Sequence, residues 1–438
     1  MPTIFAPITN ATRAGISVIR ISGPHTVECL ENLGFKGAPQ HQKVSFQKIR
    51  DPENSEIIDE VLVAFFQSPR SFTGEDVAEI SIHASPFIAK KVFEILSDIP
   101  NVRFAEAGEF SKRAFLNGKM DLVQAEAIPD LIAAETAAQH KQALRQLEGR
   151  LGEIYENWRY RLIEISAMIE AAIDFPDEDL PKNITDKVEE NVKKLAAEIE
   201  LHLDDKKIGE KIKDGLSLAI IGAPNVGKSS LINFLAQSEV AIVSEIAGTT
   251  RDVIEVHLSI AGVPVRISDT AGLRQTEDKI EAEGIRRALK KAADADLKIF
   301  LLDAENPILR EEDKELIDEN TIVVVNKIDL AVSNYQLTNA VVEVSLTKNT
   351  NTSQLLKKLE ERILEIIPTQ NSPLITQNRY RVALKNSVAN LHSFSLEKNI
   401  ELAAEDLRMT AREIGKITGK VDVENILDVI FSSFCIGK

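Results

Sequence analysis

Hydrophobic residues in the first 118 positions occur in short runs separated by turn residues. The runs Ile16–Ile21, Val61–Phe66 and Val77–Ile82 are rich in β-branched and aromatic residues. Runs of this length bounded by polar turns predict β-strands. One helix is predicted from Pro86 to Leu96. Residues 1–118 are therefore expected to form a compact α+β domain.

From about residue 119 to residue 212 the hydrophobic pattern becomes helical. Apolar residues recur at spacings of three and four: Leu144, Leu147, Leu151, Ile154, Trp158, Leu162 and Ile165. This stripe predicts one long helix, and a packing surface is favoured over a binding groove. Phe175-Pro176 is expected to end the helical run, and Pro129 to kink or start a helix. The same periodicity returns from 375 to 438.

Between these helical segments, apolar strands alternate with helices. Strands are predicted at Ser217–Ile221, Val263–Ser268 and Thr321–Val325, and helices from Ser230 onward and over Thr352–Ile367. The alternation predicts a doubly wound parallel sheet. Pro368 and Pro373 bracket a linker. The simplest organisation inserts this α/β domain, residues 213–370, between two halves, 119–212 and 371–438, of one helical domain.

A phosphate-binding motif follows the first of these strands. Gly222-Ala-Pro-Asn-Val-Gly227-Lys228-Ser229 matches the P-loop pattern G-x-x-x-x-G-K-[ST]. Glycines let backbone N–H groups surround a polyphosphate, the lysine reaches the terminal phosphates, and the serine hydroxyl can bind Mg²⁺. A chance glycine loop is the alternative, and the flanking strand and helix argue against it.

Three further motifs indicate guanine and GTP. Asn326-Lys-Ile-Asp329 ends a strand, and an aspartate there can accept from the ring N–H and 2-amino group of guanine, although an ordinary turn would look similar. Asp269-Thr-Ala-Gly272 can hold Mg²⁺ through water and meet the γ-phosphate. Thr250, in Gly248-Thr-Thr-Arg-Asp252, can complete the metal shell. In this order the motifs resemble the translation-factor-related GTPases. Ser345-Leu346-Thr347 is a weaker match to the fifth motif.

The water-orienting glutamine of Ras-like enzymes is missing, because the residue after D-T-A-G is Leu273. Hydrolysis must therefore use another polar group or a cation. The candidates are Arg274, Glu281 and Asn225. Glu281 lies at the start of a helix expected over Glu281–Ala293, where a solvated carboxylate with no catalytic role is an equal alternative.

Composition restricts the class of protein. The chain of 438 residues has a formal charge of −16 and a pI of about 5.1, which argues against indiscriminate nucleic-acid binding. Lys182, Lys206-Lys207, Lys211 and Lys213 alternate with acids, as on a solvated helix face. No apolar stretch has transmembrane length and no signal peptide is expected. Two cysteines, Cys29 and Cys435, indicate a reducing compartment, so we expect a cytoplasmic protein without membrane attachment.

Segments outside the nucleotide motifs carry a family resemblance. Together with those motifs, they resemble the MnmE (TrmE) family of tRNA uridine-modification GTPases from residue 16 to the end. The segments are Phe72-Thr-Gly-Glu-Asp76, Gly108-Glu-Phe-Ser-Lys-Arg-Ala-Phe-Leu116, Ala171-Ala-Ile-Asp-Phe-Pro-Asp177 and Phe431-Ser-Ser-Phe-Cys-Ile-Gly-Lys438. The resemblance implies addition of a carboxymethylaminomethyl or aminomethyl group to C5 of the wobble uridine, position 34, of certain tRNAs. It implies a tetrahydrofolate one-carbon donor and a heterotetramer with the FAD-dependent partner MnmG (GidA). FAD is expected only on that partner, because no G-x-G-x-x-G follows a strand here.

The resemblance also implies a site for 5-formyl- or 5,10-methylene-tetrahydrofolate in the N-terminal domain. Its residues would be Arg20, Glu79, Lys119 and Lys438. A carboxylate can accept both the N3–H and the 2-amino group of a pterin, and cations suit the anionic folate tail. Without the resemblance, these residues would be interpreted as surface charges.

For the nucleotide site, the resemblance implies K⁺ in place of the missing glutamine. The K⁺ ligands would be Asn225, Ser244, Ile246 and Thr249, and Mg²⁺ would bind Ser229 and Thr250. Glu281 would orient water, with Asn225 and Lys228 also catalytic, and loops of two chains would meet in a homodimer. The GTP-binding residues would be Asn225, Val226, Gly227, Lys228, Ser229, Ser230, Ser244, Glu245, Ile246, Ala247, Gly248, Thr249, Thr250, Asp269, Thr270, Ala271, Gly272, Asn326, Lys327, Asp329, Ser345, Leu346 and Thr347.

Alternatives remain at this stage. A ribosome-assembly GTPase would be expected to carry a basic RNA module such as a KH domain, whose G-x-x-G loop is absent after residue 370. A non-catalytic dimeric scaffold is weakened by the intact P-loop lysine and D-T-A-G. Cys435 resembles a prenylation box only superficially, because Gly437 and Lys438 do not suit one. Its remaining interpretations are a residue near the folate chemistry, slightly favoured, and a packed thiol.

Overall fold

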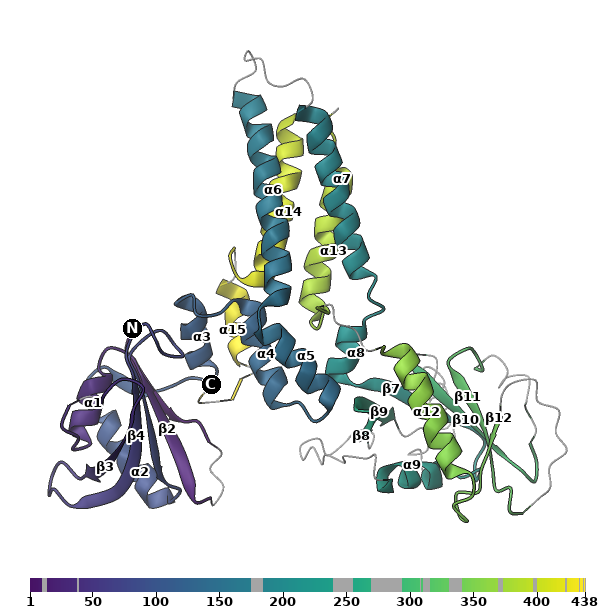
Figure 1. Cartoon of the computed structure of the whole chain (residues 1–438), viewed down its shortest axis with the longest axis horizontal. Helices are drawn as coiled ribbons and strands as arrows, with labels where there is room; N and C mark the ends of the chain where they lie inside the picture. The colour runs from purple at the N-terminus through teal and green to yellow at the C-terminus, as the bar shows by residue number, and fades with distance from the viewer. Residues whose placement is uncertain are drawn as a thin grey trace, which may run out of the picture. The chain divides into compact units, whose positions relative to one another are not determined.

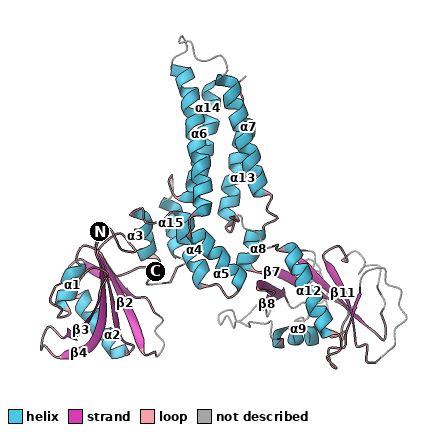
Figure 2. Cartoon of the chain, in the orientation of Figure 1, coloured by secondary structure: helices cyan, strands magenta, loops and turns pink. Residues whose placement is uncertain are grey.

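The structure is a computed structural model of the whole chain, and it divides into two compact units. It describes residues 1–9, 14–37, 39–174, 184–238, 255–268, 294–307, 309, 316–330, 341–368, 373–396, 400–421, 424–432, 434–435 and 437. The first unit comprises Met1–Pro129, Leu147–Val188 and Ser393–Lys438, and the second comprises Asp130–Gln146 and Glu189–His392. Figure 1 traces the elements along the chain, and Figure 2 distinguishes helices from strands.

The first unit contains a six-stranded, mostly antiparallel sheet. Its order is β3 (Val44–Arg50), β4 (Ile57–Phe66), β5 (Val77–His83), β2 (Ile16–Ser22), β1 (Thr3–Pro7) and β6 (Val102–Phe104), with only β1 and β6 parallel. Helices α1 (Thr26–Asn32) and α2 (Pro86–Ser97) pack on it, because alternate strand residues such as Ile19, Val63 and Ile80 form an apolar core with Val92 of α2. The predicted strands and the predicted helix are confirmed.

The rest of this unit is helical. It contains α3 (Glu109–Leu116), most of α4 (Leu122–Ile132), α6 (Arg150–Asp174), α14 (Ile400–Thr418) and α15 (Glu424–Ser432). Figure 1 shows α6 and α14 running side by side as a long pair, and they are in extensive contact. Leu151, Trp158 and Leu162 of the predicted stripe are buried.

One helix prediction is wrong. The single long helix through Leu144 and Ile165 is two helices, α5 (Ala137–Leu147) and α6, because Gly149 adopts φ +86° and interrupts the backbone hydrogen bonding. The spacing of apolar residues continues across this break, so periodicity alone missed it. Pro129 was predicted to kink or start a helix, and it lies inside α4, which begins at Leu122, so it does not start one.

The second unit is built on a six-stranded sheet of the doubly wound type. Its order is β12 (Val341–Glu343), β11 (Thr321–Asn326), β10 (Leu297–Asp303), β7 (Leu216–Ile221), β9 (Val263–Ser268) and β8 (Glu255–Ile260). All neighbours are parallel except β8 and β9, which form a hairpin. The predicted α/β class is confirmed. Near-continuous apolar strands such as β10 and β11 are buried, as parallel sheets require.

The helices of this unit are α5, α7 (Ile184–Leu203), α8 (Ile208–Asp214), α9 (Lys228–Gln237), α12 (Thr352–Ile366) and α13 (Asn378–Ser393). Of these, α8, α9 and α12 contact the sheet. The predicted helices after Ser230 and from Thr352 are confirmed, whereas Glu281–Ala293 lies outside the described residues. Searching the described residues finds no helix with the length and hydrophobicity needed to span a membrane.

The lysines predicted to lie on a solvated helix face have a more specific arrangement. Lys206 and Lys207 occupy a turn with positive φ, not a helix. Lys211 and Lys213, on α8, are ion-paired with Asp296 at 2.9 Å and Asp130 at 2.9 Å. Lys182 lies outside the described residues.

Candidate functional site

The P-loop connects the end of β7 to the start of α9. Gly222, Asn225 and Gly227 have φ values of +151°, +66° and +105°. An added Cβ at Gly222 would lie 2.3 Å from the Leu301 carbonyl oxygen, and one at Gly227 would lie 2.3 Å from Asn326 Nδ2. Both positions therefore require glycine, and the backbone forms the curved loop that surrounds a phosphate.

Lys228 lies over this loop. Its Nζ donates to the carbonyl oxygens of Gly222 at 2.8 Å and Ala223 at 2.9 Å. Ser229 and Ser230, in the first turn of α9, are exposed. The helix N-terminus, the lysine and the serine hydroxyls thus converge where an anionic phosphate would be stabilised.

Asn326 joins three of the predicted nucleotide motifs. Its side chain is 4% exposed; Nδ2 donates to the Val226 carbonyl oxygen at 2.9 Å, and Oδ1 accepts from the Leu346 N–H at 3.2 Å. Through these two bonds the side chain holds the P-loop and the Ser345–Thr347 loop in place.

Asp329 and Lys327 complete the end of β11. The Asp329 carboxylate is exposed, beside a turn in which the Leu330 N–H donates to the Lys327 carbonyl oxygen at 2.9 Å. Lys327 Nζ bonds Asp303 Oδ2 at 2.6 Å. Burial acts to raise the pKa of Asp303, but hydrogen bonds from Lys327 and from the Glu305 N–H lower it overall. Asp303 therefore holds Lys327 as an ion pair.

These motifs meet at one edge of the sheet. β7, β10, β11 and β12 are parallel, so the residues after their carboxyl ends lie together. Ligands of doubly wound folds bind at this edge. β9 is parallel to β7 and ends at Ser268, directly before the D-T-A-G motif.

Part of the predicted nucleotide site lies outside the described residues. These positions are Ser244, Glu245, Ile246, Ala247, Gly248, Thr249, Thr250, Asp269, Thr270, Ala271, Gly272, Leu273, Arg274 and Glu281. Their predicted roles remain predictions.

In the first unit, Arg20 and Glu79 are direct partners across β2 and β5. Arg20 Nε and Nη2 both donate to Glu79 Oε1, at 3.0 and 2.8 Å. Among the described residues, none donates to Glu79 Oε2. The side chains of Arg20 and Glu79 are 15% and 30% exposed. The sequence assigned Arg20 to an anionic tail; here the guanidinium orients the carboxylate, whose second oxygen is available to a ligand.

Two aromatic rings flank the Arg20 guanidinium. Its carbon lies 5.0 Å from the Phe72 ring centroid and 5.5 Å from that of Phe110. Phe110 is buried, whereas Phe72 is 36% exposed. The exposed ring beside a carboxylate offers a flat surface to a planar heterocycle.

Lys119, in the connection between α3 and α4, lies against the loop that carries Phe72. Its Nζ donates to the Pro69 carbonyl oxygen at 2.9 Å, and its stem would be 3.4 Å from a Cβ added at Gly74. The same loop accepts a hydrogen bond from Asn117 Nδ2 at the Thr73 carbonyl oxygen, at 2.7 Å. Residues 117 and 119 thus fix the segment 69–74 beside the Arg20–Glu79 pair.

A buried ion network joins two of the family-like segments. Arg113 Nη1 donates to Glu75 at 3.0 Å and Arg113 Nη2 to Glu109 at 2.8 Å, and Arg103 also pairs with Glu109 at 2.8 Å. Burial acts to raise the pKa of Glu109, but hydrogen bonds from Arg103, the Glu106 N–H and Arg113 lower it overall. The segments 72–76 and 108–116 are therefore coupled through paired charges, which supports the position of Phe72.

The C-terminal tail reaches the same domain. The Gly108 N–H lies 3.5 Å from the Cys435 carbonyl oxygen, and a Cβ at Gly437 would lie 2.3 Å from the Pro7 carbonyl oxygen. Cys435 is exposed, so a packed thiol is wrong for it. Cys29 is buried, and burial raises the pKa of its thiol to about 12. Lys438 lies outside the described residues.

Sequence reasoning missed Phe72, Phe110 and Asp303 as parts of these sites. Phe72 and Phe110 belong to quoted segments, and an aromatic residue beside a charged pair could have suggested them. Asp303 ends a buried strand, which is a recognisable position in a parallel sheet. Their partners could not be assigned without the strand order.

Comparisons with known proteins cover the entire chain. Residues 3–119 match the family model "GTP-binding protein TrmE N-terminus", and residues 122–435 match "MnmE helical domain". The chain is 48% identical over 445 residues to the tRNA modification GTPase MnmE of Rickettsia bellii (strain RML369-C), covering 100% of both proteins. The MnmE of Rickettsia typhi (strain ATCC VR-144 / Wilmington) gives the same identity and coverage. Among solved structures, the G domain of the T. maritima FeoB iron transporter matches 34% of this chain and 98% of its own, with 28% identity and a TM-score of 0.26.

Proposed function

The chain belongs to the MnmE family of tRNA modification GTPases, and on that basis we propose that its GTP hydrolysis depends on K⁺ and that it modifies C5 of wobble uridine with a folate-derived carbon. It is a GTPase, it binds GTP, and tRNA is its substrate. The observation that carries the proposal for the nucleotide site is the Asn326 amide, which joins the P-loop, the N-K-x-D segment and the Ser345–Thr347 loop.

The nucleotide would be held in three places. The P-loop amides and Lys228 would bind the phosphates, and the exposed Asp329 carboxylate would accept from guanine. Asn326 would act as a positioning residue, because both ends of its amide are used within the protein. Lys327 would be fixed by Asp303.

The donor groups on the P-loop fit Mg²⁺ and K⁺. Ser229 offers an exposed hydroxyl, and Asn225 offers an exposed amide at a left-handed turn of the loop. Oxygen donors suit both hard cations. When bound, these cations would neutralise charge that develops on the transferred phosphoryl group. We propose Thr250 as a further Mg²⁺ ligand, and Ser244, Ile246 and Thr249 as further K⁺ ligands. Glu281 would orient the attacking water.

The Arg20–Glu79 pair is proposed to recognise a reduced folate. Oε2 of Glu79 can accept from the pterin while Oε1 remains bound to Arg20, and the exposed Phe72 ring can contact the planar heterocycle. Lys119 and Lys438 would interact with the anionic tail. The folate would supply the one-carbon unit. Cys435 is proposed to lie near this chemistry, since the tail meets the same domain through Gly108 and Gly437.

The proposed product carries a carboxymethylaminomethyl or aminomethyl group at C5 of uridine 34 in certain tRNAs. FAD would be provided by the partner MnmG in a heterotetramer, and the reaction would take place in the cytoplasm. A homodimer is proposed as well. The face of the N-terminal sheet opposite α1 and α2 supports it: Val44, Phe46 and Leu62 there are 66%, 60% and 48% exposed.

We propose three domains for these activities. Residues 1–118 would bind folate, residues 213–370 would form the GTPase domain, and 119–212 with 371–438 would form a discontinuous helical domain. The family-model boundary between residues 119 and 122 supports the first division. The parallel sheet between β7 and β12 supports the extent of the second.

The K⁺ proposal is tested by steady-state GTP hydrolysis in KCl and in NaCl at equal ionic strength. The native chain is expected to turn over faster in KCl, and Asn225→Ala to lose most of that difference. Lys357→Ala, an exposed change on α12, is the control and should keep the K⁺ preference. Equal native rates in the two salts would contradict the K⁺ role.

A further inference from the structure

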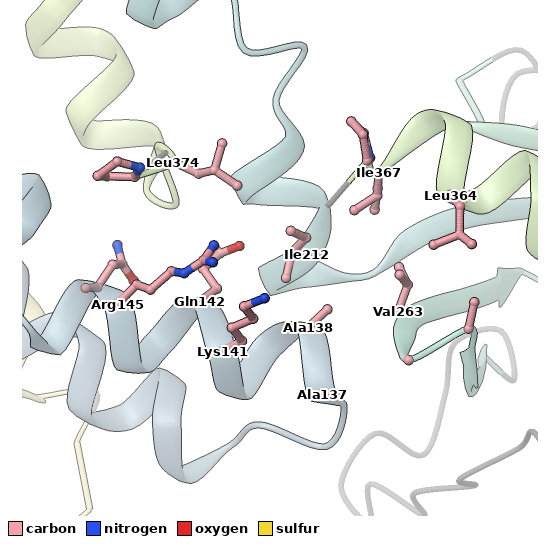
Figure 3. Close-up of a pocket in the computed structure, with 15 residues that line it drawn as sticks. Ala137, Ala138, Lys141, Gln142, Arg145, Ile212, Val263, Leu364, Ile367 and Leu374 are labelled. Carbon is pink, nitrogen blue, oxygen red and sulfur yellow. The ribbon is translucent and has the colours of Figure 1, made fainter. Parts of the chain in front are cut away.

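A cavity of about 220 Å³ lies inside the second unit, on the opposite edge of its sheet from the nucleotide motifs. Its walls come from α5, the end of α8, the β8–β9 turn, the end of α12 and residues 373–374 (Figure 3). Pockets for drug-sized ligands usually enclose roughly 300–1,000 Å³. The cavity is below that range, so it suits a small molecule.

Most of its lining is apolar, but the α5 wall is basic. Ile212, Val263, Ile367 and Leu374 contribute hydrocarbon surface. Figure 3 shows Lys141, Gln142 and Arg145 on the side of α5 that faces these residues. The fifteen described residues that line the cavity include these two cations and no acid. An apolar body with one anionic group would complement this wall.

Gln142 adds a specific polar requirement. Its Nε2 donates to the Gly209 carbonyl oxygen at 3.0 Å, which fixes the orientation of the amide. Its Oε1 is buried and accepts no hydrogen bond from the described residues. A buried unpaired acceptor is costly, and a donor on a bound molecule would satisfy it. The fitting ligand therefore carries an O–H or N–H group as well as its anionic group.

The cavity also contacts the hairpin that leads to the nucleotide site. Ala261, Gly262 and Val263 line it, and the Ala138 N–H donates to the Gly262 carbonyl oxygen at 3.0 Å. At its open end, the β8–β9 hairpin pairs Glu255 with Ser268. The G-T-T-R-D segment precedes Glu255 and D-T-A-G follows Ser268. Six-residue strands at about 3.4 Å per residue put roughly 17–20 Å between the two ends.

We propose that this cavity is a regulatory site for a small hydroxylated or aminated apolar carboxylate, and that its occupancy is coupled to the nucleotide state. The α5 cations bind the carboxylate, and Gln142 Oε1 accepts from the hydroxyl or amine. The hairpin transmits the coupling, because segments of this kind respond to the γ-phosphate in GTPases.

The binding test uses 3-hydroxybenzoate as the probe, with saturation-transfer NMR on the full chain saturated with GDP and Mg²⁺ so that the phosphate site is filled. Benzoate, which lacks the donor, and 3-hydroxybenzyl alcohol, which lacks the charge, should both bind more weakly. Lys141→Gln should lower the affinity for 3-hydroxybenzoate by about two- to fivefold, as expected for the loss of an exposed cation. The control Lys357→Gln, on an exposed position of α12, should leave binding unchanged.

Leu364→Trp is the decisive variant. Leu364 lines the cavity yet is 45% exposed, so a larger side chain can enter the space without repacking the core. This variant should lose 3-hydroxybenzoate binding while it retains GDP binding. Absence of binding to the native chain, or unchanged binding to Leu364→Trp, would overturn the site.

Coupling is tested by comparing the affinity of the probe for the chain filled with GDP and with a non-hydrolysable GTP analogue. Thermodynamic linkage requires that the GTP analogue and the probe change each other's affinity by the same factor relative to GDP. We expect this factor to be about five or more. Equal affinities in the two nucleotide states would overturn the regulatory role.

Discussion

Asp329 is the residue that most directly decides the choice of base. Its carboxylate is exposed at the end of β11, whereas the neighbouring Asn326 is buried and hydrogen-bonded to Val226 and Leu346. Asp329→Asn should lower the affinity for GTP by at least about 100-fold, because two charge-assisted hydrogen bonds to guanine are lost. It should raise the affinity for xanthosine triphosphate. Fluorescent nucleotide titration measures both. Asp294→Asn, another exposed aspartate of the second unit, should change neither. Tight ATP binding by the native chain would contradict the assignment.

Glu79 is the corresponding residue of the N-terminal domain. Glu79→Ala should lower the affinity for 5-formyl-tetrahydrofolate, measured by calorimetry, by at least about 100-fold. The reason is that the pterin loses a charged acceptor that Arg20 holds in position. GTP hydrolysis should remain near the native rate. Glu94→Ala provides a control in the same domain, since Glu94 is an exposed acid on α2, which packs on the other face of the sheet from Val44, Phe46 and Leu62. Undiminished folate binding by Glu79→Ala would show that this carboxylate is not the acceptor.

The sequence predicted which residues belong to each site better than it predicted which residues they contact. The P-loop glycines could be assigned because each has a local backbone requirement, which the φ values of Gly222 and Gly227 show. The Arg20–Glu79 pair could not, because the two residues are 59 positions apart and meet only through the pairing of β2 and β5. The aromatic residues beside Arg20 depend on the same tertiary arrangement.

The turn between α7 and α8 is stabilised by Arg381, a buried residue of α13. Arg381 donates to Glu210 at 2.7 Å, to Asp205 at 2.7 Å and to the Leu203 carbonyl oxygen at 3.0 Å. α8 leads directly into β7 and the P-loop. Breaking a buried ion pair by removing one partner typically costs about 3–5 kcal/mol. Arg381→Ala should therefore lower the thermal unfolding midpoint of the chain by several degrees in calorimetry.

Lys385→Ala is the matched control for that change, because Lys385 is an exposed cation on the same helix. Its unfolding midpoint should stay within about one degree of the native value, as surface substitutions usually have small effects. If Arg381→Ala and Lys385→Ala had the same thermal unfolding midpoint, the buried ion pairs of Arg381 would not stabilise the turn between α7 and α8.

Among the secondary-structure elements, the strands were predicted correctly, but the boundary between α5 and α6 was missed. The parallel strands have near-continuous apolar runs that no helix pattern imitates over six residues. The break at Gly149 escaped because Leu147 and Leu151 retain helical spacing across it. A glycine followed by a charged residue was the available signal, but glycine alone also occurs inside helices.

At the scale of the whole molecule, the two candidate sites lie in different compact units and use different chemistry. The Arg20–Glu79 pair belongs to the first unit, and the P-loop belongs to the second. The order of motifs predicted an inserted α/β domain, and the sheet order agrees with a doubly wound fold. The grouping of α5 with the second unit was not foreseen, because its cavity and its bond to Gly262 depend on tertiary contacts.

We propose that one chain uses both the nucleotide site and the Arg20–Glu79 site to modify tRNA. The most direct measurement is nucleoside analysis of wobble uridines from cells whose only copy of this chain carries Glu79→Ala or Lys228→Ala. Each substitution should remove the C5 substituent, while Glu94→Ala leaves it at the native level, because folate recognition and GTP turnover are both required. Native modification in the presence of either Glu79→Ala or Lys228→Ala, at normal protein abundance, would contradict the account.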